Sequence, residues 1–318
     1  MLKPLEGARK ILDAMCVKPG ESVLILAEEC TATDASVFIN AALEAKTEPI
    51  MLVMPNLSYN GQEPPALVAE TMKKANVIIG AAKASISTTK ARVQATDNGA
   101  RLFVISGFTT SMLVEGCIEA DFIKVRPTVA TVAKALDQAK NVRITSEGGT
   151  NLTLSIDGRK GRALDAICDE PGCFKSMSIE ANAAPIEDTA NGILVVDGAA
   201  PTGSTRNQPV IVKIEDGTIR SMDGGENAER LWKFLTEVGD PNIFRVAEFG
   251  IGLNPAARLT GNNYVEDESA IGTAHIGIGR NTSMGGLIDA KAHFDLIINK
   301  PNIFLDNKPF MEAGNLRL

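Results

Sequence analysis

The sequence of 318 residues lacks an excess of positive charge, a long apolar run and a paired set of cysteines. Its 39 acidic residues outnumber its 32 Lys and Arg residues, which argues against nucleic acid as a partner because phosphate binding needs clustered cations. No stretch approaches the roughly 18 apolar residues of a membrane span, and segment 1–14 has no apolar core of the signal-peptide kind. We therefore expect no nucleic-acid partner, no membrane association, and a small molecule or short peptide as the substrate.

Five cysteines are scattered through the chain, an odd number that argues against a disulfide framework. Reduced thiols are typical of cytoplasmic proteins, so we expect a cytoplasmic location. Aromatic residues are few, at 4%, whereas hydrophobic residues make up 44% and charged residues 22% of the chain. This composition is typical of a soluble globular protein, and the length is sufficient for two domains.

Short apolar runs alternate with helical patterns up to residue 125. The strand-like runs are 22–26, 49–54, 76–80 and 101–105, and the helical patterns between them are 33–45, 63–74 and 87–98. This alternation predicts a Rossmann-like, doubly wound α/β domain with a parallel sheet. Ala27-Glu28-Glu29-Cys30 follows the first run in place of a glycine-rich dinucleotide turn, so no nicotinamide cofactor is expected.

The pattern changes to strand alternation with hairpin signals after residue 140. Asp-Gly pairs at 157–158 and 216–217 each stand between two strand-like runs, and one amphipathic helix is expected at 228–238. These features predict an α+β, mainly antiparallel second domain. We place the Rossmann-like α/β domain at 1–135 and an α+β metal-binding catalytic domain at 136–318.

The chain has two histidines, His275 and His293, and both lie close to acidic side chains. Alternate residues of a strand share a face, so His293 and Asp295 can reach the same metal ion. By the same argument His275 shares its face with Gly277 and Gly279, whose missing side chains leave room for an ion and a substrate. The alternative for each histidine is a core residue that is hydrogen-bonded to a carboxylate.

Three glutamates complete the candidate site. Glu248 lies inside the apolar, glycine-rich segment 246–255, where an unpaired buried carboxylate would be costly. Glu268 ends an acidic run seven residues before His275, and Glu187 follows Pro185-Ile186. The alternative for each glutamate is a solvated residue in a loop or at a strand end.

Four segments resemble, in order, the metal-binding segments of the leucyl aminopeptidase T and S family of dinuclear metallopeptidases. These segments are 185–188, 248–250, 267–279 and 293–295. The resemblance implies two divalent ions, of zinc, cobalt or manganese, held by six residues: Glu187, Glu248, Glu268, His275, His293 and Asp295.

The same resemblance implies a metal-dependent aminopeptidase-like hydrolase, in which Glu187 and Glu268 are catalytic and a metal-activated water attacks the peptide bond at a free N-terminus. It also implies a homodimer. Asn254, Arg280 and Thr282 are candidate substrate contacts, although Thr282 stands where the peptidases carry a tyrosine.

Two alternatives remain open. His275, His293 and Asp295 are a two-histidine, one-carboxylate set of the type that non-haem Fe(II) oxygenases use. The 2,5-dihydroxypyridine dioxygenases resemble the chain more distantly, and one Fe(II) would then serve ring cleavage. The second alternative is a non-catalytic protein on the same fold, with Arg280 and Asn281 contacting a small acid. The hydrolase is preferred because the remaining candidate ligands are all carboxylates.

Overall fold

A computed structural model describes residues 2–318. The chain falls into two compact units, the first formed by Met1–Arg126 with Leu164–Ser178 and the second by Pro127–Ala163 with Ile179–Leu318. The sequence prediction placed a single boundary between residues 135 and 136. It did not foresee the return of Leu164–Ser178 to the first unit, where strand β8 (Phe174–Ser176) pairs with β4.

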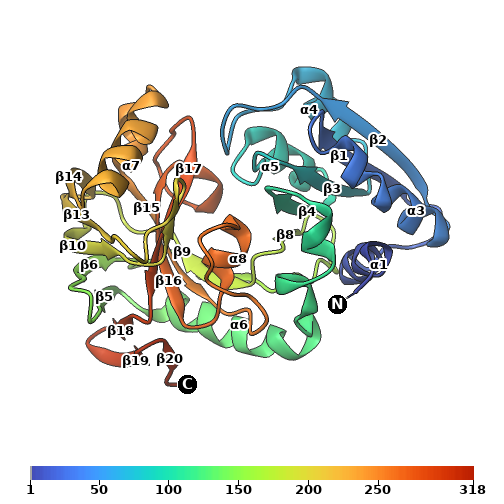
Figure 1. The fold of residues 1–318 in the computed structure, drawn as a ribbon. Coiled ribbons are helices and arrows are strands. Elements are labelled where there is room, and N and C mark those ends of the chain that lie inside the picture. Colours follow the sequence, from blue (N-terminus) through green and yellow to red (C-terminus); the bar gives the residue numbers. More distant parts are fainter. Residues whose placement is uncertain (1) are drawn as a thin grey trace. The chain divides into compact units, whose positions relative to one another are not determined.

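The first unit contains a five-stranded parallel sheet with the order β2-β1-β3-β4-β8, as Figure 1 shows. Its other strands are β1 (Ser22–Glu28), β2 (Glu48–Met54), β3 (Val77–Ala82) and β4 (Arg101–Ser106). The helical elements of this part of the chain are α1 (Pro4–Ala14), α2 (Ala32–Ala35), α3 (Val37–Glu44), α4 (Ala66–Met72), α5 (Lys90–Asp97), η1 (Thr110–Leu113), η2 (Gly116–Glu119) and the first part of α6 (Phe122–Gln138). The predicted doubly wound α/β pattern is confirmed.

The apolar runs of the first unit form strands because both faces of the inner strands are covered. Every residue of β3 is buried, and Ile78 packs in one core cluster with Leu24, Leu102 and Met72. Strand β2 lies at the edge of the sheet, which leaves Ile50 64% exposed.

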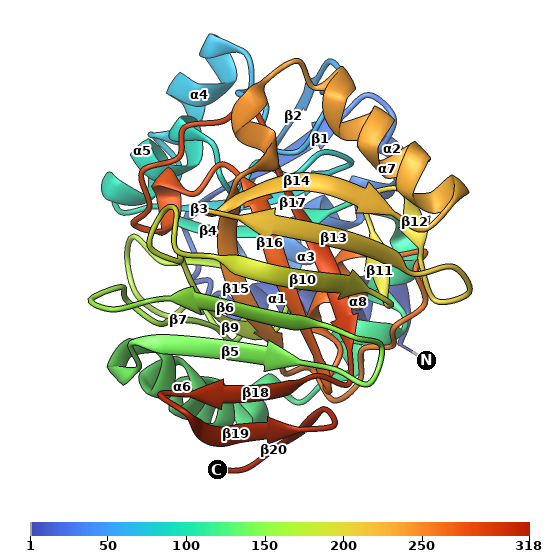
Figure 2. The same ribbon diagram turned by 90° about the vertical axis from the view of Figure 1, so that its left-hand side faces the viewer.

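The second unit is built on antiparallel pairing. Figure 2 shows its eight-stranded sheet side by side, in the order β14-β13-β10-β6-β5-β18-β19-β20. These strands are β5 (Asn141–Thr145), β6 (Asn151–Ser155), β10 (Asn191–Val196), β13 (Val210–Glu215), β14 (Thr218–Asp223), β18 (Asn302–Leu305), β19 (Lys308–Glu312) and β20 (Asn315–Leu316). Helix α7 (Glu226–Glu237) contacts β13 and β14.

A second sheet in this unit has the order β17-β16-β15-β9-β7. Its strands are β7 (Arg162–Leu164), β9 (Glu180–Ala183), β15 (Val246–Gly252), β16 (Thr273–Gly279) and β17 (His293–Asn299). The remaining elements are the ribbon β11 (Ala199–Ala200) and β12 (Gly203–Ser204), helix α8 (Tyr264–Ser269), and the short helices η3 (Pro241–Phe244) and η4 (Thr282–Met284). The prediction of an α+β, mainly antiparallel second domain is confirmed.

The two predicted hairpins have different outcomes. The pair β13–β14 turns at Asp216 and Gly217, as expected. The hairpin at 157–158 is wrong, because β6 pairs with β5 and β10 whereas β7 belongs to the other sheet. Across residues 2–318, no helix combines the length and the apolar character that a membrane crossing requires.

The two Asp-Gly turns give a matched test of how tightly the second unit is packed. A Cβ added to Gly158 (φ 72°) would meet nothing within 4 Å, whereas a Cβ on Gly217 (φ 67°) would lie 2.7 Å from the Asp188 nitrogen. We expect Gly158→Ala to cost about 1 kcal/mol from backbone strain. Gly217→Ala should cost at least about 1 kcal/mol more, because the Asp188 backbone must also move. Urea unfolding midpoints of the two variants measure this difference, and equal losses would contradict it.

Candidate metal centre

Strands β15, β16 and β17 bring the candidate ligands onto one face of their sheet. Glu248 lies directly opposite Gly277, and Gly277 lies directly opposite Asp295 on the next strand. Residues directly opposite one another share a face, so the two carboxylates flank a position with no side chain. The other face carries the apolar residues Phe249 and Ile276, which are fully buried.

The side chains form two groups that share Glu248. In the first, His293 Nε2 lies 3.0 Å from Glu248 Oε2 and 3.3 Å from Asp295 Oδ1. In the second, His275 Nε2 lies 3.5 Å from Glu180 Oε2 and 3.8 Å from Glu248 Oε1. Glu180 is on β9, which pairs with the other edge of β15.

The donor set and its spacing fit a divalent metal ion. Ligand atoms bound at about 2.1 Å to one ion lie roughly 3 to 3.5 Å apart, close to the separations in the first group. Glu180 Oε2, which faces His275 Nε2, is buried and has no hydrogen-bond partner among the described residues. Buried polar atoms without partners are rare, and imidazole and carboxylate are ordinary ligands for zinc, iron and manganese.

The charges of the cluster also favour a cation. Burial raises the pKa of Glu180 to about 7. Burial opposes protonation of His275, but Glu180 and Glu248 outweigh it and raise the pKa of His275 to about 10. Likewise burial would raise the pKa of Glu248, but hydrogen bonds with His275 and His293 lower it below its usual range. Three carboxylates, of Glu180, Glu248 and Asp295, face two imidazoles, so with neutral imidazoles the cluster has an excess of negative charge that a bound cation would compensate.

Two glycines make room for the histidine rings. A Cβ on Gly250 would lie 1.9 Å from His275 Nε2. A Cβ on Gly277 would lie 2.6 Å from the Glu248 Cβ and 2.8 Å from both Asp295 Oδ1 and His293 Cε1. The expectation that Gly277 leaves space at this face therefore has a steric basis in the structure.

Hydrogen bonds outside the cluster orient two of its members. His293 Nδ1 lies 2.8 Å from the Arg280 carbonyl oxygen, which can only accept a hydrogen bond, so Nδ1 donates and Nε2 is the ring nitrogen that faces Glu248 and Asp295. Asn182 Nδ2 donates to Glu180 Oε1 over 2.7 Å, which turns Glu180 Oε2 toward His275.

Two of the six predicted ligands are not in either group. Glu187 Oε2 pairs with Arg159, and Glu187 Oε1 accepts a hydrogen bond from the Leu287 nitrogen over 2.7 Å, so both of its oxygens are engaged elsewhere. Glu268 is buried at the end of α8. Within residues 2–318 the metal-type groups comprise Glu180, Glu248, His275, His293 and Asp295.

Sequence reasoning missed Glu180. The signal was present, because Glu180 and Asn182 alternate with Ile179, Ala181 and Ala183 in an otherwise apolar strand. A glutamate that is only 5% exposed in such a strand needs a partner or an ion.

The three candidate substrate residues have separate surroundings. Asn254 Oδ1 accepts hydrogen bonds from the nitrogens of Ala256, over 2.9 Å, and Ala257, over 3.3 Å, and so closes a turn. The Arg280 side chain lies near Asp289, with Nε 3.5 Å from Oδ1. Thr282 is exposed in η4.

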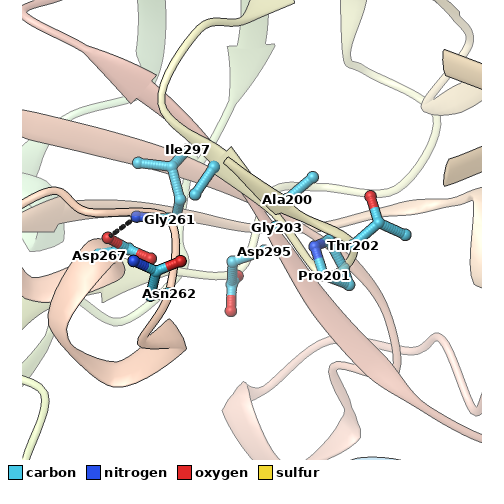
Figure 3. Close-up of a pocket in the computed structure, with 10 residues that line it drawn as sticks. Ala200, Pro201, Thr202, Gly203, Gly261, Asn262, Asp267, Asp295 and Ile297 are labelled. Atoms are coloured by element: carbon cyan, nitrogen blue, oxygen red, sulfur yellow. Dashed lines mark hydrogen bonds between the residues drawn. The ribbon is translucent and has the colours of Figure 1, made fainter. Parts of the chain in front are cut away.

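A pocket of about 360 Å³ adjoins the first group through Asp295. In Figure 3, Asp295 lies between Asn262 and Asp267 on one side and Pro201 and Thr202 on the other. Asp267 Oδ1 accepts hydrogen bonds from the nitrogens of Thr260, over 2.6 Å, and Gly261, over 2.8 Å, which fixes this wall. The volume suits a small molecule that would lie beside Asp295.

Comparison with known proteins identifies the family. The sequence profile of 2,5-dihydroxypyridine 5,6-dioxygenase matches residues 5–318. The chain belongs to this dioxygenase family. A 2,5-dihydroxypyridine 5,6-dioxygenase of Pseudomonas putida KT2440 is 26% identical over 193 residues, covering 57% of this chain. The match spans about half, 55%, of that relative's length.

Two solved structures share the fold. The 2,5-dihydroxypyridine dioxygenase from Pseudomonas putida KT2440 superposes with a TM-score of 0.86 at 20% identity, covering 98% of this chain and 96% of that one. AmpT from Thermus thermophilus superposes with a TM-score of 0.69 at 13% identity, covering 99% of both chains.

Family membership corrects the main functional prediction. The interpretation as an aminopeptidase-like hydrolase, and hence as a metalloprotease, is wrong, and the dioxygenase that was the alternative has the support. The short metal-binding segments misled because they resemble those of peptidases with a related fold, and a related fold does not fix the reaction. An enzyme was correctly expected.

Gly277→Ala tests the space that the centre requires. We expect the dissociation constant of Co(II) to rise by about tenfold or more, because the new methyl group collides with Glu248, Asp295 and His293. Gly80→Ala is the matched control in strand β3, where the nearest atom to a Cβ would be 3.4 Å away. Isothermal titration of both variants measures the affinity, and a Gly277→Ala variant that binds like the control would contradict the geometry.

Glu187→Ala tests the role that the structure gives this residue. It should lower the free energy of unfolding by about 1 to 3 kcal/mol through the loss of its contacts with Arg159 and Leu287. Its Co(II) affinity should stay within about threefold of the parent value. The Co(II) affinity of Glu248→Ala should fall by more than about 100-fold, because this variant removes a ligand shared by both groups. If the Co(II) affinity of Glu187→Ala fell as far as that of Glu248→Ala, Glu187 would be a metal ligand.

Proposed function

We propose that this chain is a non-haem Fe(II) dioxygenase that opens the ring of a dihydroxypyridine. One observation carries the proposal in addition to family membership: Asp295 belongs both to the first metal group and to the wall of the pocket. An ion held by Glu248, His293 and Asp295 would therefore adjoin the space that a small ring can occupy.

The reaction class follows from the relatives' names. A 5,6-dioxygenase breaks the bond between ring atoms 5 and 6, and both atoms of O₂ enter the product, so no external reductant is consumed. The ring itself supplies the electrons that reduce O₂, and iron(II), when bound, would bring the ring and O₂ together and relay these electrons without being consumed. The single-iron alternative thus replaces the two zinc, cobalt or manganese ions that the peptidase resemblance implied.

The chain's own residues have three tasks in this proposal. Glu248, His293 and Asp295 hold the metal, and the Arg280 carbonyl keeps the lone pair of His293 Nε2 directed at it. Ala199, Ala200 and Ile297 supply apolar wall that limits water, a condition for controlled oxygen chemistry. Thr202 and Asn262 can exchange hydrogen bonds with the ring hydroxyl groups.

The donor set differs from the usual two-histidine, one-carboxylate set of such enzymes. The first group has one histidine and two carboxylates, while His275 lies on the far side of Glu248 with Glu180. Carboxylate and imidazole are both ligands of Fe(II), so this set can also hold iron. Its two carboxylates give the ion more negative charge than a two-histidine, one-carboxylate set does.

Oxygen consumption by iron-loaded protein tests this function. Protein is reconstituted anaerobically with Fe(II) and mixed with 2,5-dihydroxypyridine. It should consume one molecule of O₂ for each molecule of 2,5-dihydroxypyridine that disappears, as followed by the absorbance of the ring. His293→Ala and Asp295→Ala should each lower the rate by more than about 100-fold, because each removes a ligand. Glu215→Gln, at an exposed ion pair, serves as the control. Iron-loaded protein that consumes no O₂ with this substrate contradicts the proposal.

The proposed substrate is a small molecule, and no nucleic-acid or membrane partner is included. The homodimer and the cytoplasmic location stay predictions from the sequence.

A further inference from the structure

The loop that joins β16 to β17 is closed by the side chain of one buried residue, Asn281. Asn281 is fully buried, its nitrogen donates to the Ile288 carbonyl over 3.0 Å, and its Oδ1 accepts from the Ile288 nitrogen over 2.8 Å. Its Nδ2 also donates to the Ala247 carbonyl of β15 over 3.2 Å. Asn281 therefore connects both ends of the loop to a third strand.

These contacts adjoin two metal-ligand candidates. Ala247 directly precedes Glu248, and Arg280, whose carbonyl bonds with His293 Nδ1 over 2.8 Å, directly precedes Asn281. The Arg280 nitrogen also donates to the Ala292 carbonyl over 2.8 Å, one residue before His293. A shift of the Asn281 side chain would thus move the supports of both Glu248 and His293.

The loop leaves Asn281 little freedom. Gly286 packs against its amide so closely that a Cβ there would lie 2.1 Å from Asn281 Cγ. The Asn281 carbonyl accepts hydrogen bonds from the nitrogens of Met284, over 2.9 Å, and Gly286, over 3.1 Å. The side chain is therefore held in one position by backbone on several sides.

We propose that Asn281 is a positioning residue of the metal centre. It holds the Arg280 carbonyl and Ala247 in register, so that His293 Nε2 and Glu248 Oε2 converge to 3.0 Å. This role rests on the metal centre of the proposed function. Residues that orient metal ligands typically contribute 10- to 100-fold to metal affinity, about the effect expected here.

Two variants disturb this amide by independent routes. Asn281→Ala removes it, and Gly286→Ala keeps it but forces it to move. Each should raise the Co(II) dissociation constant by about 10- to 100-fold and alter the visible absorption spectrum of the bound Co(II). Asn302→Ala is the matched control, because its amide also joins two segments of the same unit, through the Ala313 nitrogen at 2.7 Å and Thr145 Oγ1 at 3.5 Å. It should lower the thermal midpoint without changing the affinity or the spectrum.

The outcomes separate this role from mere stabilisation of the fold. If Asn281→Ala and Gly286→Ala bind Co(II) within about threefold of the parent, with an unchanged spectrum, Asn281 is only structural and the proposal is overturned. Should Asn281→Ala fail to fold, the Co(II) affinities and spectra of Gly286→Ala and Asn281→Asp decide whether Asn281 is a positioning residue. A parent chain that binds no Co(II) overturns the centre and this role together. A parent chain that binds iron but consumes no O₂ overturns the proposed reaction alone. The Co(II) affinities of the variants then still decide the role of Asn281.

Discussion

The second unit depends on one constraint: three carboxylates and two imidazoles share a buried face of a single sheet. Glu248 is the centre of this arrangement, since it contacts His293 through one oxygen and His275 through the other. Burying so much charge is costly unless each group is compensated. Glycines at positions 250 and 277 let the groups approach one another, and a metal ion would satisfy Glu180 Oε2, which has no hydrogen-bond partner among the described residues.

Several parts of this arrangement could be predicted from the sequence. Strand alternation placed His293 beside Asp295 and gave His275 a glycine-lined face, because the two-residue period of a strand is a local property. The parallel sheet of the first unit followed equally well from its short apolar runs. Glu248 was identified because a carboxylate in an apolar segment is conspicuous.

Other parts depend on contacts that a sequence does not reveal. Glu180 enters the site only because β9 pairs with the far edge of β15, a pairing between residues about 70 positions apart. Glu187 lies in a motif that resembles a ligand segment, yet Arg159 and Leu287 engage both of its oxygens. The choice between the two reaction classes was also out of reach, because a shared fold does not fix the reaction.

The proposed function requires one iron ion held by Glu248, His293 and Asp295 beside the pocket. Anomalous diffraction at the iron absorption edge, on crystals loaded anaerobically with Fe(II), locates that ion directly. We expect a single strong peak within about 2 to 2.3 Å of ligand atoms from all three residues. A peak bound by other side chains, or none at this face of the sheet in iron-loaded crystals, would contradict it.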